Sequence, residues 1–362
     1  MARTTLHALN AYTVFETLNA RGLELTTTDL LKNYLFAKAS SSDRPSMLRR
    51  WQRIAATVGQ QNVPELLRYH MLCEEPKVRS RRLFKLVRDR YRSPRDVYDL
   101  LTVLESRAEV FAAVKDPAHG YWVEIRDARR YVTELNVFRV TQMMPLLFVV
   151  WEEWPERDFV RTSKLVCTLA FRYTVVSRQN PNDLESAYHR ASKAVKDGAV
   201  QGPGELFEVL QGIYVSDERT ATDFTFLSIP TRGPRKRLVK YILARLEEDR
   251  SGKPCDPETD PGTIEHILPE NPGAAWEDDF PPGSQDAVVN RIGNLTLLEA
   301  GLNREVANAG YADKAQAYAR SRYSLTRAVL EMAPEDWTPA RLDARQRRFE
   351  DRVVHLWRAD FA

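Results

Sequence analysis

Only one part of this 362-residue chain carries a convincing strand pattern, and it lies near the C-terminus. The two strand candidates are short apolar runs at residues 263–268 and 292–298. A breaker-rich stretch at 249–263 separates them from the preceding chain, in which apolar residues recur at helical spacing. The pattern predicts a mainly α fold, in which a helical domain is followed by a small strand–loop–strand–helix module embedded in helices.

Local start signals support the helical assignment. The segment Ser93-Pro94-Arg95-Asp96 places a capping serine before a proline at the first helical position, with an acid three residues after the cap. Further helices are predicted from about residue 303 to 321 and after residue 337. The strand pair is therefore expected to have helices on both sides.

Composition limits the classes of function. The net charge of +3 is too small to indicate a nucleic-acid-binding protein by itself, so that claim depends on local basic clusters. The three cysteines, Cys73, Cys167 and Cys255, are odd in number and far apart, which argues against disulfides or a structural zinc site. The longest apolar run, at 143–151, is about half as long as a bilayer requires. We expect a cytoplasmic protein with no membrane partner.

The first strand candidate ends in an unusual pair, Glu265 and His266, inside the segment TIEHILPENP. Because neighbouring side chains of a strand point to opposite faces, only one of the two can face the core. Taken alone, the pair would be an exposed dipeptide and the segment IGNLTLLEA an amphipathic strand. The context favours a functional interpretation, because Asn294 stands at the second strand and Asn303 and Asn308 follow at the next helix.

This order of residues resembles the ββα-metal fold of HNH nucleases. The resemblance implies that His266 is the general base that activates water and that Asn294 braces the loop carrying it. It also implies that Glu265, Asn303 and Asn308 hold one divalent cation, for which oxygen ligands favour Mg²⁺ or Mn²⁺ over zinc. Phosphodiester hydrolysis needs both groups, since water must lose a proton and the charge that builds on the phosphate must be neutralised.

The similarity extends beyond these residues. The segments NRIGNLTLLEAGLNREVANAGYADKAQAYARS and RQRRF resemble the C-terminal domain of GmrSD-type, modification-dependent restriction proteins. The same domain occurs in the SspE phosphorothioate-sensing phage-defence proteins. The similarity covers roughly residues 230–360, and the segment VFETLNARGLELTTTDLLKNYLF resembles the end of the N-terminal domain that precedes it in this family.

The chain departs from the family pattern near its N-terminus. The family's N-terminal domain hydrolyses nucleotides through an Asp-Gly-Gln-Gln-Arg-type motif, which this sequence lacks, as it lacks a Walker-type loop. Nucleotide hydrolysis is therefore not expected of this chain. Three explanations are open: a truncated gene product, a mis-called start, or a nuclease half that works with a separate nucleotide-hydrolysing sensor subunit or by self-association. The expected parts are a sensor remnant at 1–40, a helical middle domain at 41–230 and an HNH nuclease domain with a C-terminal helix at 231–362.

Basic residues gather at 77–92, at 126–130 and at 232–245. A helix with such charges could follow a phosphate backbone, and the third cluster directly precedes the nuclease module. The predicted DNA-binding residues are Arg232, Arg235, Lys236, Arg237 and Lys240. The cluster at 77–92 fits a solvated helix face equally well. Arg291, just before the second strand, is added to His266 and Asn294 as a catalytic residue, because it could clamp the scissile phosphate; a surface ion pair is the alternative.

Two functions from different classes are open at this point. The first is a metal-dependent DNA endonuclease or nickase of a modification-dependent restriction or anti-phage defence system, acting on modified or phage DNA. The second is a non-catalytic helical scaffold or adaptor that binds DNA within a defence complex. The intact set of Glu265, His266, Asn294 and Asn303 favours the first, and the missing sensor motif favours the second.

Overall fold

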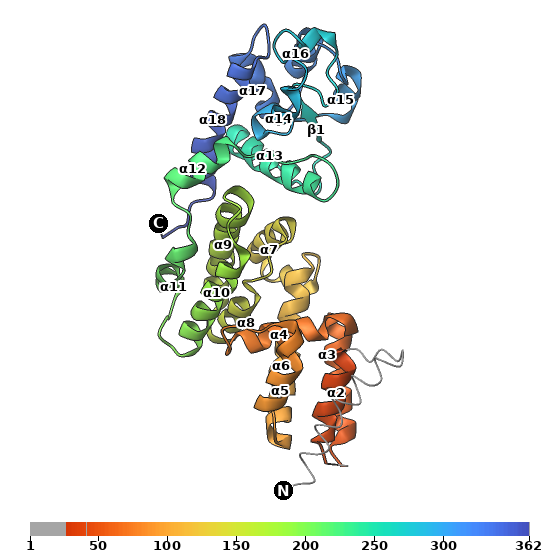
Figure 1. The fold of residues 1–362 in the computed structure, drawn as a ribbon, viewed down its shortest axis with the longest axis vertical. Helices are drawn as coiled ribbons and strands as arrows, with labels where there is room; N and C mark the ends of the chain where they lie inside the picture. Colours follow the sequence, from red (N-terminus) through yellow and green to blue (C-terminus); the bar gives the residue numbers. More distant parts are fainter. Residues whose placement is uncertain (1–26, 41, 362) are drawn as a thin grey trace. The chain divides into compact units, whose positions relative to one another are not determined.

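The computed structural model of the chain describes residues 27–40 and 42–361 and is mainly helical, as predicted (Figure 1). The described residues contain one sheet, with two strands. They divide into two compact units. The first unit comprises Met1–Val132, Thr141–Ser163 and Asn182–Leu210, and the second comprises Thr133–Val140, Lys164–Pro181 and Gln211–Ala362. Residues 1–26, which hold most of the predicted sensor remnant, lie outside the described residues.

The first unit is built from helices. They are α2 (Thr27–Ala37), α3 (Arg44–Val58), α4 (Val63–Leu72), α5 (Leu83–Arg90), α6 (Pro94–Lys115), α8 (Met144–Glu153), α10 (Pro181–Lys196) and α11 (Pro203–Leu210), with one-turn helices η1 (Gln60–Asn62), η2 (Ser80–Arg82) and η3 (Gly120–Val123). Unit boundaries fall inside α7 (Arg126–Phe138) and α9 (Glu156–Ala170). Among the described residues, no helix combines the length and the apolar character that crossing a bilayer requires.

Helix α6 begins where the sequence predicts. The Ser93 hydroxyl accepts a hydrogen bond from the Asp96 amide at 3.2 Å, and the Asp96 carboxylate accepts one from the Ser93 amide at 2.9 Å. This reciprocal capping box satisfies two amides that have no partner within the helix. The apolar face of α6 is buried, with Leu100, Leu101 and Leu104 in the core of the first unit.

A polar network is buried in the first unit. The Arg107 guanidinium on α6 donates two hydrogen bonds to Glu152 on α8, at 2.7 and 2.8 Å. It also lies 2.9 Å from Nδ1 of His70, whose Nε2 lies 2.6 Å from the Tyr91 hydroxyl. Each charged or polar group therefore has a partner, as buried groups require. His70 is a satisfied core histidine.

The second unit contains the sheet. After the π-helical turn η4 (Phe171–Val176) and the one-turn helix η5 (Gln211–Ile213), its elements are α12 (Asp217–Thr225), α13 (Arg235–Ser251), β1 (Thr263–His266), η6 (Ala274–Trp276), α14 (Gln285–Val288), η7 (Ile292–Asn294), β2 (Leu295–Leu298), α15 (Ala300–Val306), α16 (Tyr311–Ala319), α17 (Ser324–Met332) and α18 (Pro339–Leu356). The strands are antiparallel, with Thr263 opposite Leu298 and His266 opposite Leu295. Helix α15 follows β2 and lies beside β1 (Figure 1).

Three predicted boundaries in this unit are wrong. The first strand ends at His266 rather than residue 268, and the second begins at Leu295 because residues 292–294 form the turn η7. The helix predicted at 303–321 is two helices, α15 and α16. The break follows from Ala307, whose φ of 34° is incompatible with a continuous right-handed helix.

The core of the module is aromatic. The Tyr311 ring lies between two tryptophans, with centroids 6.4 Å from Trp276 and 6.4 Å from Trp337. The indole of Trp276 also donates a hydrogen bond to the Ala309 carbonyl at 3.1 Å. Buried residues from the segment just after β1, from β2 and from four helices complete this core: Ile267, Leu268, Leu298, Val306, Ala317, Tyr318, Val329 and Leu342. A two-stranded sheet is marginal by itself, so this packing is what holds the strand pair in place.

Candidate functional site

The two faces of β1 separate Glu265 from His266, as the alternation of a strand requires. Glu265 is 3% exposed and faces the core. The His266 side chain, 14% exposed, faces the other way and reaches the surface of the unit. The acid, and not the histidine, is therefore the residue of this pair that faces the core.

His266 lies at the end of a short chain of polar groups. Its Nε2 is 3.3 Å from the Thr231 hydroxyl, and that hydroxyl is 3.4 Å from the Glu270 carboxylate. A carboxylate can only accept, so the single hydroxyl proton of Thr231 points to Glu270 and the hydroxyl oxygen accepts from His266. This assigns the ring proton to Nε2. Nδ1 then carries the lone pair and makes no hydrogen bond of good geometry to the described residues.

Burial sets the protonation state of His266. It lowers the pKa of the imidazole to about 4, and the positive charges of Lys314 and Arg232 act in the same direction, while the Glu270 carboxylate opposes them. The ring is therefore neutral at pH 7. Asn290 beside the ring favours its protonated form. The buried Oδ1 of Asn290 has no hydrogen-bond partner of good geometry among the described residues, so it can accept a hydrogen bond from the ring once His266 is protonated.

Asn294 holds the segment that follows His266. Its amide oxygen accepts hydrogen bonds from the Leu268 amide at 2.9 Å and from the Trp337 indole at 3.1 Å. Its amide nitrogen donates to the carbonyls of Leu268 at 2.9 Å and Val289 at 3.0 Å. Because Asn294 is fully buried and uses all four hydrogen-bonding positions, its side chain holds the segment after His266 and has no hydrogen-bonding position left for a ligand.

The turn that presents Asn294 is fastened to α18. The Gly293 amide donates to Gln346 at 2.5 Å, and the Arg345 guanidinium donates to the carbonyls of Gly293 and Leu295, each at 2.8 Å. A Cβ at position 293 would lie 2.9 Å from the Leu342 carbonyl oxygen, which is too close for any residue larger than glycine. The glycine of the IGNL segment is thus explained by close packing.

The predicted cation ligand Glu265 is engaged in a buried ion pair. Its Oε1 accepts from the Lys314 ammonium at 2.7 Å and from the Tyr318 hydroxyl at 2.9 Å. Burial raises the pKa of Glu265 and lowers that of Lys314, while their mutual attraction works against both shifts. The lysine ammonium already supplies the positive charge that a metal ion would bring to this carboxylate.

The other two predicted ligands point elsewhere. The Asn303 amide nitrogen donates to the Thr263 hydroxyl at 2.9 Å and to the Ile264 carbonyl at 3.0 Å, which ties α15 to β1. Asn308 is exposed in the turn after α15. Within the described ranges, no three His, Cys, Asp or Glu side chains gather as a metal site would require. Glu265, Asn303 and Asn308 therefore do not fit a preformed Mg²⁺ or Mn²⁺ site.

The predicted DNA-binding residues lie just before α13 and in its first two turns, and the first of them, Arg232, is near His266. Arg232 pairs with Glu270 at 3.0 Å, Arg237 with Glu258 at 2.7 Å, and the Lys240 ammonium donates to the Asp260 carbonyl at 2.7 Å. Arg235 and Lys236 are exposed and have no ion-pair partner among the described residues. Thr231, which directly precedes this basic segment, contacts His266. Its neighbour Arg232 therefore lies beside the histidine.

Arg291 is not free to clamp a phosphate. Its guanidinium pairs with Asp343 at 2.5 Å and donates to the Thr225 carbonyl at 3.2 Å. The surface ion pair, the alternative considered for this residue, is the observed state. The basic stretch at 77–92 supplies Lys77 and Arg79 to a cavity of about 550 Å³ in the first unit, so part of it lines a concave surface.

Sequence reasoning missed the closest neighbours of His266 and Glu265: Thr231, Glu270, Asn290, Lys314 and Tyr318. The sequence could have indicated Glu270 as a neighbour of His266, since it follows the histidine by four residues in the same segment. No sequence pattern indicated Lys314 or Tyr318, because these residues of α16 are 49 and 53 positions from Glu265 in the sequence.

Comparison with known protein families gives a match over the region that contains these residues. Residues 214–351 match the family described as GmrSD restriction endonucleases, C-terminal domain. No curated protein matches the chain. The matched range lies within the second unit and includes β1, β2, α15 and the basic start of α13. It confirms the resemblance drawn from the sequence. Residues 214–351 therefore form a domain similar to the C-terminal domain of the GmrSD restriction endonucleases.

Proposed function

We propose that the second unit is a DNA endonuclease or nickase of the HNH type, which hydrolyses phosphodiester bonds with His266 as the general base. The observation that carries this proposal is the state of His266: the ring is neutral, and Nδ1 makes no good hydrogen bond to the described residues. The ring also lies beside the basic start of α13. A base with a free lone pair next to a phosphate-binding surface is what the reaction needs.

In the proposed reaction, a water oxygen attacks phosphorus while its proton passes to Nδ1 of His266. The bond from phosphorus to the leaving oxygen breaks, and that oxygen takes a proton from solvent. The imidazolium that forms donates through Nε2 to Thr231, whose hydroxyl donates to the Glu270 carboxylate. Asn290 favours the same protonated ring. These neighbours stabilise the charged form that the step produces.

The start of α13 is suited to phosphate. Its first turn contains three basic residues and no acid, although the dipole of a helix disfavours positive side chains at this end. Arg235 and Lys236 therefore cost some stability where they stand, and their positive charges add to the helix N-terminus as an attraction for anions. We propose that these two residues contact the DNA backbone.

Dependence on Mg²⁺ or Mn²⁺ belongs to the proposal because the HNH resemblance implies it, whereas the described residues do not assemble a cation site. We also propose that the protein acts in the cytoplasm on modified or phage DNA. It would receive its regulation from a separate nucleotide-hydrolysing sensor subunit or from a second copy of the chain.

Supercoiled plasmid is the direct test. We expect the purified chain to convert it to open-circular or linear DNA with Mg²⁺ or Mn²⁺ but not with EDTA, and we expect His266→Gln to bind the plasmid without cutting it. Parallel reactions on modified phage DNA and unmodified DNA measure modification dependence. Cleavage that survives EDTA would remove the metal from the proposal, and cleavage by His266→Gln would remove the base.

One observation favours the second candidate, a DNA-binding adaptor without catalysis. The Glu265 carboxylate is closed off by Lys314 and Tyr318. Plasmid binding that Arg235→Gln weakens, with no cleavage of any substrate under any metal condition, would select the adaptor.

A further inference from the structure

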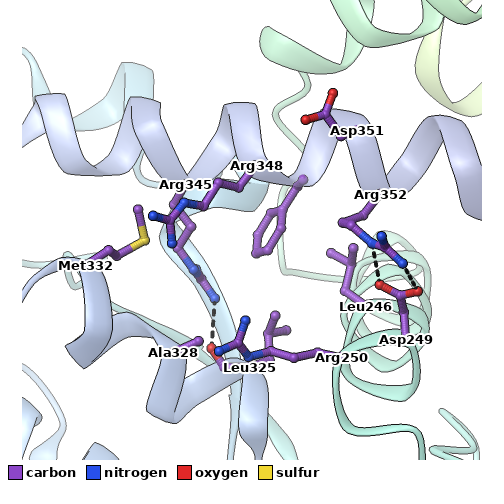
Figure 2. A pocket seen from close by; sticks show the side chains of 11 residues that line it. Leu246, Asp249, Arg250, Leu325, Ala328, Met332, Arg345, Arg348, Asp351 and Arg352 are labelled. Carbon is purple, nitrogen blue, oxygen red and sulfur yellow. Dashed lines mark hydrogen bonds and ion pairs between the residues drawn. The ribbon is translucent and has the colours of Figure 1, made fainter.

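The second unit contains a pocket on the far part of α13, away from the basic start of that helix. Its volume is about 570 Å³, within the range of roughly 300–1,000 Å³ that is usual for small-molecule sites. Helices α13, α17 and α18 line it, and Figure 2 shows the side chains that face it. Four arginines and two aspartates provide its polar lining: Arg250, Arg345, Arg348, Arg352, Asp249 and Asp351.

Two of these arginines are neutralised within the protein. Arg352 forms a two-pronged ion pair with Asp249 in the wall of the pocket, as Figure 2 shows. The Arg250 guanidinium binds both oxygens of Glu331, each at 2.7 Å. Asp351 points away from the pocket (Figure 2). Neither of the other two arginines, Arg345 and Arg348, has a carboxylate partner among the described residues.

Arg345 differs in this respect from the other buried arginines. In the described part of the chain three arginines are buried, and Arg107 and Arg172 are each paired with a carboxylate, Glu152 at 2.7 Å and Asp217 at 2.7 Å. Arg345, which is 2% exposed, donates to the carbonyls of Gly293 and Leu295 and has a 3.5 Å contact with the Leu325 carbonyl. Its guanidinium also lies 4.8 Å from the centroid of the Phe349 ring, and it has no carboxylate partner among the described residues. A buried charge without a counter-charge is costly, and burial lowers the pKa of this guanidinium to about 9.

Arg348 stands one helical turn along α18 from Arg345, on the same side of the helix. Its side chain is exposed and makes no hydrogen bond or ion pair to the described residues. Figure 2 shows both side chains leaving α18 next to each other toward the pocket. The two guanidinium groups thus present two uncompensated positive charges to one small space.

The remaining wall is apolar. Leu246, Met332 and Phe349 line it together with Leu325 and Ala328. The pocket therefore combines a dicationic corner with an apolar surface that includes one aromatic ring. A phosphate monoester carries a charge of roughly −1.5 to −2 at pH 7 and accepts several hydrogen bonds, which matches two guanidinium groups better than a single carboxylate does.

We propose that this pocket binds a small phosphate monoester with an apolar or aromatic body, of the size of a mononucleotide. The phosphate lies at Arg345 and Arg348, and the body packs against Leu246, Met332 and Phe349. The site is distinct from the His266 centre. Its volume admits one nucleotide-sized molecule but no duplex, so the ligand is a small molecule.

The test is calorimetric titration of the full chain with AMP, inorganic phosphate and adenosine. Arg345 also holds the turn at Asn294, so the informative variant is Arg348→Gln, which removes no contact to the described residues. The matched control is Arg347→Gln, since Arg347 is the adjacent exposed arginine of α18 and does not line the pocket. Unfolding temperatures confirm that both variants fold.

We expect saturable AMP binding by the wild type. Arg348→Gln should weaken it about tenfold or more, because it removes one charge-assisted hydrogen bond, and Arg347→Gln should weaken it less than about twofold. Adenosine should bind at least about tenfold more weakly than AMP. Three results would overturn the proposal: no binding of AMP or phosphate at millimolar concentration, equal loss in both variants, or adenosine binding as tightly as AMP. A fourth arm uses a single-stranded oligonucleotide without terminal phosphate. Binding of that strand through Arg348 without binding of AMP would assign the arginines to DNA and also overturn the small-ligand proposal.

Discussion

Each unit contains a histidine whose pKa is lowered by burial, His70 and His266, and the two differ in what their ring nitrogens bind. In the first unit, Nδ1 of His70 is 2.9 Å from the Arg107 guanidinium, which can only donate, so this nitrogen is the acceptor. Its Nε2 proton points to the Tyr91 hydroxyl at 2.6 Å. In the second unit, Nε2 of His266 also carries the proton, but Nδ1 has no hydrogen bond of good geometry to the described residues.

The difference shows that a perturbed pKa does not identify a catalytic histidine. Both rings are neutral at pH 7, and both have a charged arginine nearby. What distinguishes them is whether the basic nitrogen is occupied. His70 cannot take a proton without losing its bond to Arg107, whereas His266 can take one and gains support from Asn290 and, through Thr231, from Glu270.

The largest effect that would test this comparison is on cleavage. We expect His266→Ala to lower the cleavage rate by about 10³-fold, the usual contribution of a general base, while DNA affinity and thermal stability stay close to those of the wild type. His70→Ala should do the opposite and destabilise the protein by roughly 2 kcal/mol, because Arg107 and Tyr91 lose a buried partner. Plasmid nicking per folded molecule and thermal unfolding measure the two effects, and retained nicking by His266→Ala contradicts the assignment.

The next effect concerns Asn294, which positions the segment after His266. Asn294→Ala removes four hydrogen bonds and leaves buried groups of Leu268, Val289 and Trp337 unpaired. We expect a loss of roughly 2–4 kcal/mol in the free energy of unfolding, measured with denaturant, and a fall in cleavage that excess Mn²⁺ does not reverse. A variant as stable as the wild type would show that the loop holds its conformation without this side chain.

A third prediction uses pH and His70. The pKa of His70 is far below its ordinary value of about 6.5 in the folded protein, so the unfolded chain binds more protons at acidic pH. Stability should therefore fall as the pH drops below about 6.5, by up to about 1.4 kcal/mol per unit from this residue. Calorimetric unfolding in EDTA should show a flatter acid limb for His70→Gln than for the wild type. His266 contributes in the same direction between about 6.5 and about 4 and is present in both proteins.

The smallest effect distinguishes two roles of Asn303. The structure shows its amide nitrogen holding β1, so Asn303→Ala should lower stability by about 1–2 kcal/mol and cleavage by less than about tenfold. Titration with Mn²⁺ should leave the residual activity unchanged. Recovery of activity in excess Mn²⁺ would instead place Asn303 among the cation ligands, as the family resemblance implies.

Much of the fold could be predicted from the sequence. Three local patterns predicted elements that the structure contains: the breaker-rich stretch before β1, the two apolar runs and the cap of α6. The predicted start of the second strand is wrong because a tertiary contact changes the backbone there. The apolar pattern predicts that residues 292–294 belong to the strand. In the structure Gly293 packs closely against α18, and these residues form the turn η7.

The candidate site was predicted in part. His266 and the basic start of α13 were found, and the structure brings them together through Thr231. Arg291 was also found, but its guanidinium is taken by Asp343, a residue 52 positions away that no spacing rule connects to it. The Lys314 ammonium at Glu265 is a similar case, with a separation of 49 residues.

The sequence alone thus determined that the chain is mainly helical, where its strand pair lies and which histidine follows an acid at the end of a strand, because periodicity and turn chemistry act over a few neighbouring residues. Only the tertiary structure decided that Glu265 is closed off by Lys314. It also decided that, among the described residues, Nδ1 of His266 has no hydrogen bond of good geometry and the buried Arg345 has no carboxylate partner. These properties depend on which groups approach from distant parts of the chain, and on how far burial excludes water from their charges.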